Sequence, residues 1–217
     1  MSARTLYLAF DEAGNGQDVK GEVIACVASL NSSDVRIGIF ERSKRSRDAF
    51  NSLNASSSAY YFTIIRNRAT KPLSCNISLA APYLVTACLS ATRLLSRDWV
   101  RDLHIVIDGA LSFKEQSFLS HKLKKDTKQI DTVTINTYPK NSHRFMSKRV
   151  KPSVRCPWLL YQADIRASSL YRMQNLLEEE SHTRRIVIED NDLHEQRGAL
   201  VEYLWRHSEG RTPTSIH

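Results

Sequence analysis

The feature that most constrains this chain is a short apolar stretch that runs directly into two adjacent carboxylates. Residues 6–10 are Leu-Tyr-Leu-Ala-Phe and predict a buried strand; Asp11 and Glu12 follow at once, and then Ala-Gly-Asn-Gly at 13–16 predicts a sharp turn. Two like charges at the end of a buried strand repel each other and are costly to desolvate. A divalent cation would offset both costs, so the stretch predicts a metal site if other segments supply more carboxylates.

The two carboxylates differ in where the strand directs them. Side chains alternate along a strand, so Asp11 shares a face with Tyr7 and Ala9, whereas Glu12 points away if the strand continues. The glycine-bearing segment predicts that the strand ends here, which would let Glu12 turn back toward Asp11. The competing interpretation of Asp11 is a turn residue that caps backbone amides.

Two further aspartates lie at places where acids are informative. Asp108 ends the apolar strand predicted over 103–107 and precedes Gly109, and ligands of α/β sheets bind at the carboxyl ends of parallel strands. Asp164 lies beside the apolar side of a helix predicted over 157–177. The alternatives are a turn or helix-capping aspartate for Asp108, and an early-turn acid favoured by the helix dipole for Asp164. Carboxylates from two strands and a helix suit Mg²⁺ or Mn²⁺ and two-metal phosphodiester cleavage.

The order of the predicted elements indicates the fold class. Strands are predicted over 5–10, 22–30, 59–65, 103–107, 132–138 and 185–188, and helices over 34–50, 80–99, 114–125, 157–177 and 194–207. An antiparallel hairpin of the first two strands, followed by alternating strands and helices, predicts an α/β fold: a mixed sheet of five to six strands with helices on both faces. We expect one domain over residues 1–210 and a frayed tail over 211–217.

The distribution of charge predicts nucleic acid as a partner. The net charge is +8, and the stretch between Asp131 and Asp164 contains no acid but many cations. Such a basic segment suits a phosphate backbone, although a solvated loop of a basic protein has the same composition. His143 in this segment either assists proton transfer or product release or is an ordinary solvated histidine. The candidate contacts with nucleic acid are Gly14, Asn15, Gly16, Lys44, Lys140, His143, Arg144, Lys148, Arg149, Lys151.

Other features predict a cytoplasmic protein without a membrane partner. No apolar run is long enough to span a bilayer, and the N-terminus leads directly into the first strand without a signal peptide. The cysteines at positions 26, 75, 88 and 156 are scattered and form no C-x-x-C pair, which indicates reduced thiols rather than zinc ligands.

These motifs resemble the ribonuclease H-like nuclease superfamily. The front half is similar to type 2 ribonuclease H in Asp-Glu-Ala-Gly-Asn-Gly at 11–16, in the Ser43-Lys44 step and in Ile-Asp-Gly at 107–109. The back half is similar to an uncharacterised bacterial and phage family of that fold, which begins with D-E-(S/A)-G and ends with a Q-x-A-D helix; here Gln-Ala-Asp occupies 162–164. The chain differs from type 2 ribonuclease H at Asn15, where that family has arginine.

The resemblance implies an activity and a set of ligands. Asp11, Glu12, Asp108 and Asp164 would hold Mg²⁺ or Mn²⁺ in a metal-dependent endonuclease, a hydrolase acting on RNA, RNA/DNA hybrid or DNA. By the same resemblance, water would attack a phosphodiester and leave a 3′-hydroxyl and a 5′-phosphate. The alternative is a non-catalytic nucleic-acid-binding module, or a subunit of a defence or mobile-element complex, on the same fold.

Overall fold

A mixed sheet is the main element of the residues that the computed structural model describes, which are 4–14, 22–41, 59–65, 77–95, 100–138, 153–172, 185–188, 199, 202 and 203. Within these residues the sheet has six strands in the order β6-β5-β1-β2-β4-β8. They are β1 (Arg4–Ala13), β2 (Glu22–Ser29), β4 (Ala59–Ile65), β5 (Val100–Asp108), β6 (Thr132–Tyr138) and β8 (Arg185–Ile188). The strands predicted over 59–65, 132–138 and 185–188 are confirmed with their bounds.

The pairing makes the sheet mostly parallel. β1 is parallel to β5, β5 to β6, and β4 to β8, whereas β2 is antiparallel to both of its neighbours, β1 and β4. The predicted hairpin of the first two strands is therefore confirmed. Because crossover connections between parallel strands place helices on the faces of a sheet, both faces are expected to be covered.

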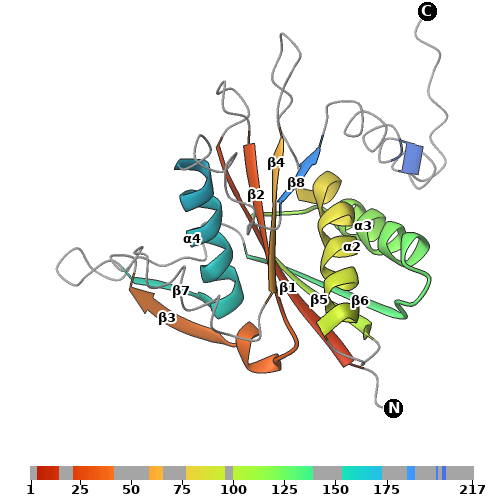
Figure 1. Ribbon diagram of the computed structural model, residues 1–217, viewed down its shortest axis with the longest axis horizontal. Coiled ribbons are helices and arrows are strands. Elements are labelled where there is room, and N and C mark those ends of the chain that lie inside the picture. Colours follow the sequence, from red (N-terminus) through yellow and green to blue (C-terminus); the bar gives the residue numbers. More distant parts are fainter. Residues whose placement is uncertain are drawn as a thin grey trace, which may run out of the picture.

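Helices do lie on both faces (Figure 1). α2 (Ile77–Leu95) and α3 (Phe113–Asp126) pack on one face, and α4 (Trp158–Arg172) packs on the other. The predicted fold class, an α/β mixed sheet with helices on both faces, is confirmed. None of the described helices is both long enough and apolar enough to cross a membrane.

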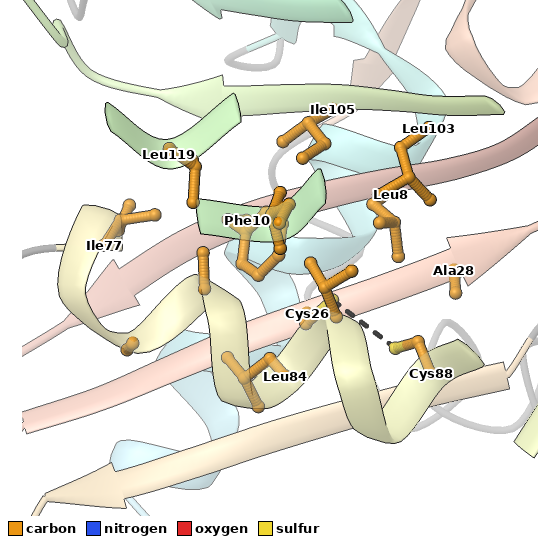
Figure 2. Packing of buried hydrophobic residues seen from close by; sticks show 14 of the residues in the cluster. Leu8, Phe10, Cys26, Ala28, Ile77, Leu84, Cys88, Leu103, Ile105 and Leu119 are labelled. Atoms are coloured by element: carbon orange, nitrogen blue, oxygen red, sulfur yellow. Dashed lines mark hydrogen bonds between the residues drawn. The ribbon is translucent and has the colours of Figure 1, made fainter. Parts of the chain in front are cut away.

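Side-chain alternation along β1 divides the core into two layers. Leu8 and Phe10 point into the larger layer with α2 and α3, whereas Ala9 points into the smaller layer beneath α4. Figure 2 shows the larger layer, in which the thiols of Cys26 and Cys88 lie 3.7 Å apart between β2 and α2. These two cysteines and Cys156 are free thiols, and Cys75 lies outside the described residues.

The bounds of α2, α3 and α4 differ from the prediction, those of α3 and the start of α4 by only one residue. α2 begins at Ile77, three residues earlier than predicted, so Pro82 lies inside the helix rather than in its first turn. Pro82 has no N–H to donate, but its carbonyl accepts a hydrogen bond from the Thr86 hydroxyl at 2.8 Å. Residues 96–99 and 173–177, the predicted ends of two helices, lie outside the described residues, as does most of the helix predicted over 194–207.

The helix predicted over 34–50 is wrong in its described part. A short 3-10 helix, η1 (Ser32–Val35), leads into a strand, β3 (Ile37–Glu41), and residues 42–50 are not described. β3 pairs antiparallel with β7 (Ser153–Pro157) in a separate two-stranded ribbon, although residues 153–155 were expected to end a basic loop. The ring of Phe40 stacks on Tyr161 of α4 with centroids 4.7 Å apart, which attaches the ribbon to the helix.

Candidate acidic site

Asp11 is a carboxylate in an unfavourable environment. β1 continues through Glu12 to Ala13, three residues past the predicted end, so Asp11 lies within the strand and is 6% exposed. Its Oδ1 accepts the backbone N–H of Glu12 at 2.8 Å. Burial raises the pKa of Asp11 well above its ordinary value, and the charges of Asp108 and Asp164 raise it further.

The sheet places Asp108 beside Asp11. Phe10 pairs with Ile107 in the parallel register of β1 and β5, so the next residues along the two strands are Asp11 and Asp108. Both face the α4 side, because their neighbours Phe10 and Ile107 both point into the opposite layer. The two carboxylates therefore share one face at the carboxyl ends of adjacent parallel strands.

Asp164 reaches the same place from α4. This helix packs across β1 and β2 on the face that carries Asp11. Asp164 is half-buried, and its charge acts on Asp11. The structure thus brings together three aspartates, Asp11, Asp108 and Asp164, that the sequence singled out from two strands and a helix.

Cys156 is a member of the cluster that the sequence did not indicate. It lies on β7 opposite Gly38, with its side chain buried toward α4. Burial, followed by the charges of Asp164, Asp108 and Asp11, raises the pKa of this thiol to about 12. A neutral thiol therefore borders the acids at physiological pH. No spacing in the sequence revealed this, because Cys156 reaches the site only through the pairing of β7 with β3.

Glu12 points away from the other acids. It is paired with Ile24, whose side chain belongs to the α2–α3 layer, and Glu12 is exposed. Among the groups that raise the pKa of Asp11, Glu12 has the smallest effect. The reason is that β1 continues to Ala13 and does not end at Phe10, where the glycine-bearing segment predicted its end. The role of Glu12 as a fourth ligand stays a prediction.

The donor chemistry of the cluster suits a hard divalent cation. Three carboxylates with one of them buried form a negative site that a cation would stabilise, and oxygen donors are those that Mg²⁺ and Mn²⁺ prefer. However, no group of three His, Cys, Asp or Glu side chains is already arranged to hold a metal ion within the described part of the chain. A shared cation would therefore require these carboxylates to rearrange.

The predicted contacts with nucleic acid lie mostly beyond the described residues. Gly14 follows β1 with a φ of 96°, and the other candidates are not described: Asn15, Gly16, Lys44, Lys140, His143, Arg144, Lys148, Arg149, Lys151. The described ends of the basic segment are nevertheless informative. The carbonyl of Tyr138 accepts a hydrogen bond from Gly109 at 2.9 Å, next to Asp108, and β7 carries Cys156. The basic segment therefore begins after Tyr138 and ends at β7, and both of these points are close to the acids.

Gly109 is required by its backbone conformation. Its φ is 111°, and a Cβ at this position would meet no atom within 4 Å. We expect Gly109→Ala to lower the free energy of unfolding by about 1–3 kcal/mol, because L-residues rarely adopt this conformation. Urea unfolding measures the change, and Ala110→Ser in the same exposed loop is the control. An unchanged midpoint for Gly109→Ala would contradict the assigned strain.

Comparisons with known proteins find similar structures but no similar sequences. No protein-family model matches the chain, and no curated protein matches it. RNase H1 from the halophilic archaeon Halobacterium salinarum NRC-1 is similar over 64% of this chain and 88% of its own, with 11% identity and a TM-score of 0.33. RNase HII from Archaeoglobus fulgidus, in its complex with PCNA, is similar over 99% of this chain and 96% of its own, with 13% identity and a TM-score of 0.36.

A third similar structure is the Mn-soaked nuclease domain of human cytomegalovirus terminase. It is similar over 97% of this chain and 76% of its own, with 10% identity and a TM-score of 0.27. At these identities and TM-scores, the function of this chain has to be inferred from its own residues.

Proposed function

We propose that the protein is a Mg²⁺- or Mn²⁺-dependent endonuclease that hydrolyses phosphodiester bonds in RNA, RNA/DNA hybrid or DNA. The observation that supports this is the meeting of Asp11, Asp108 and Asp164 on one face of the sheet, with Asp11 buried and repelled by the other two. Such an arrangement costs stability in the metal-free protein, and costs of this kind are concentrated at functional sites.

The three aspartates have distinct positions for this chemistry. Asp11 on β1, Asp108 on β5 and Asp164 on α4 would together hold the cations. The cations would supply Lewis acidity toward the phosphate and a more acidic attacking water. The N–H of Glu12 holds Oδ1 of Asp11 in place. The buried thiol of Cys156 adds no charge to the wall of the site, because its pKa is about 12.

The basic segment would hold the substrate. Residues 139–152 contain Lys140, Arg144, Lys148 and other cations and no acid. They connect Tyr138, which is hydrogen-bonded beside Asp108, to β7, which borders the acids. A phosphate backbone bound by these cations would be held by a segment whose two described ends border the carboxylates, and binding should weaken as salt rises.

A cleavage assay tests the proposal. Labelled RNA, DNA and RNA/DNA hybrid are incubated with the wild type in EDTA, Mg²⁺ or Mn²⁺, beside Asp11→Asn and a matched control, Asp131→Asn. Asp131 is exposed and ion-paired with Arg101 at 3.3 Å, immediately before β6 and at the opposite end of that strand from Tyr138. We expect metal-dependent cleavage by the wild type and the control, and none by Asp11→Asn. Cleavage that survives in Asp11→Asn would overturn the assignment.

The alternative is a non-catalytic nucleic-acid-binding module, or a subunit of a defence or mobile-element complex. One observation favours it: among the described side chains, no three are already placed as ligands of one ion. The same experiment separates the two functions. Salt-dependent binding without cleavage of any substrate in either metal, by wild type and Asp11→Asn alike, is the result expected of a binding module.

A further inference from the structure

α4 covers only part of its face of the sheet. It packs mainly on β1 and β2, contacts β5 less and makes few contacts with β6, although Tyr138 at the end of β6 packs against the α4 layer. On β6, Val133 and Ile135 pack into the opposite layer. Thr134 and Asn136 therefore face the α4 side, and both are exposed. A polar strip of sheet is thus open to solvent on the face that carries the acids.

The strip is in register with the acidic cluster. Parallel pairing aligns Tyr7 with His104 and His104 with Thr134, and it aligns Asp108 with Tyr138. Residues two apart on a strand share a face and are separated by about 6.6 Å. On this face, the row of residues that contains His104 and Thr134 is followed by the row of Val106 and Asn136, and then by the row of Asp108 and Tyr138. A ligand bound along β5 and β6 on this face would therefore extend directly to the carboxylates.

The side chains of the strip offer rings and hydrogen bonds rather than charge. Nδ2 of Asn136 lies 2.9 Å from Nε2 of His104, and the rings of Tyr7 and His104 have centroids 5.6 Å apart. Partial burial lowers the pKa of His104 below its ordinary value, which favours the neutral imidazole. Tyr138 adds a half-buried ring next to Asp108.

We propose that this open strip, the β5–β6 platform formed by His104, Thr134, Asn136 and Tyr138, holds a single-stranded segment of nucleic acid beside the acidic cluster. The proposal rests on the proposed nuclease function and narrows its substrate to a strand that is unpaired next to the cleavage site. Open sheet faces with aromatic rings bind unpaired bases by stacking and by hydrogen bonds to base edges. A duplex hides those base faces, so a platform of rings and amides discriminates against it.

Binding measured without metal tests the platform independently of cleavage. Fluorescence anisotropy in EDTA compares a short labelled single strand with the same sequence as a duplex. For the double variant His104→Ala/Asn136→Ala we expect about tenfold weaker binding of the single strand, which is the loss of roughly one base contact. The slope of affinity against salt should stay the same, because no cation is removed. The affinity for the duplex should change little.

Two further variants sharpen the result. His121→Ala removes an exposed histidine from α3, on the other face of the sheet, and should bind like the wild type. Asn136→Asp keeps the side-chain shape at an exposed position and adds a negative charge, so it should also weaken binding of the single strand. Thermal unfolding of each variant confirms that it is folded. Unchanged single-strand affinity in the folded double variant would overturn the platform, as would an equal loss for the duplex.

Failure of the platform and failure of the nuclease give different results. If the wild type cleaves a single strand and the double variant has the same KM, the platform is wrong and the nuclease stands. If no protein cleaves but the double variant loses single-strand affinity, the platform stands and the catalytic function is wrong.

Discussion

Asp11→Asn is expected to make the metal-free protein more stable at neutral pH while removing its response to Mn²⁺. The wild type buries an aspartate whose pKa is raised by burial and by Asp108 and Asp164. Asparagine keeps the shape and the hydrogen bond from the Glu12 N–H but carries no charge. We expect a gain of about 1 kcal/mol, typical for relief of a destabilised functional site, which is about 2–4 °C in Tm for a chain of this size.

The sign of the pH dependence follows from proton linkage. The folded pKa of Asp11 lies above the ordinary value of 3.8, so the native state binds a proton more tightly than the unfolded chain does. Stability of the wild type therefore falls as pH rises from 3.8 through the folded pKa, and the loss is complete above it. The Asp11→Asn variant has no such loss of stability, because the asparagine side chain does not titrate. The stability advantage of Asp11→Asn should vanish below pH 3.8 and be largest at neutral pH.

Thermal unfolding across pH, in EDTA and in Mn²⁺, measures both effects. At a Mn²⁺ concentration a hundred times its dissociation constant, the wild type should gain about 2.7 kcal/mol and Asp11→Asn almost nothing. Asp131→Asn, which alters an exposed ion pair with Arg101, is the control and should respond to Mn²⁺ like the wild type. A variant that is less stable than the wild type in EDTA, or equally stabilised by Mn²⁺, would contradict this account of Asp11.

The elements that could be predicted are those whose signal is local. β4, β6 and β8 are short runs of β-branched and aromatic residues, and their bounds agree with the prediction. α2, α3 and α4 have apolar residues at helical spacing, so their presence was predictable even where their ends were not. β3 was missed because its partner is β7, more than a hundred residues away, and no local pattern encodes that pairing.

The same difference between local signals and long-range pairing explains which residues of the candidate site could be predicted. Asp11 and Asp108 could be anticipated because each follows an apolar strand, and parallel strands bring their carboxyl ends to one edge. Asp164 was indicated by its place beside the apolar side of a helix. Cys156 could not be anticipated, because it depends on the β3–β7 ribbon. The direction of Glu12 depends on the pairing of β1 with β2 as far as Ala13, which the glycine turn did not reveal.

Asp164 and Glu12 are expected to contribute very differently to the rate of cleavage. Asp164→Asn should lower the rate of metal-dependent cleavage by at least about 100-fold, because residues that only support metal ligands already cost 10–100-fold when removed. Glu12→Gln should cost less than about tenfold, which is 1.4 kcal/mol of transition-state stabilisation. The reason is geometric: the charge of Asp164 acts on Asp11 more than that of Glu12 does, and Glu12 is exposed on the opposite side of β1.

Single-turnover cleavage with saturating enzyme measures these rates without interference from substrate affinity. Both substitutions remove one negative charge, so they are matched controls for the electrostatics of substrate approach. Retained metal-dependent stabilisation in Glu12→Gln, and its loss in Asp164→Asn, would assign the ligands independently of turnover. The opposite order, with Glu12→Gln inactive and Asp164→Asn active, would mean that the end of β1 rearranges when metal binds and directs Glu12 toward Asp11. The continuous strand through Ala13 makes that rearrangement costly, because the backbone pairs of Glu12 and Ala13 with β2 would have to break.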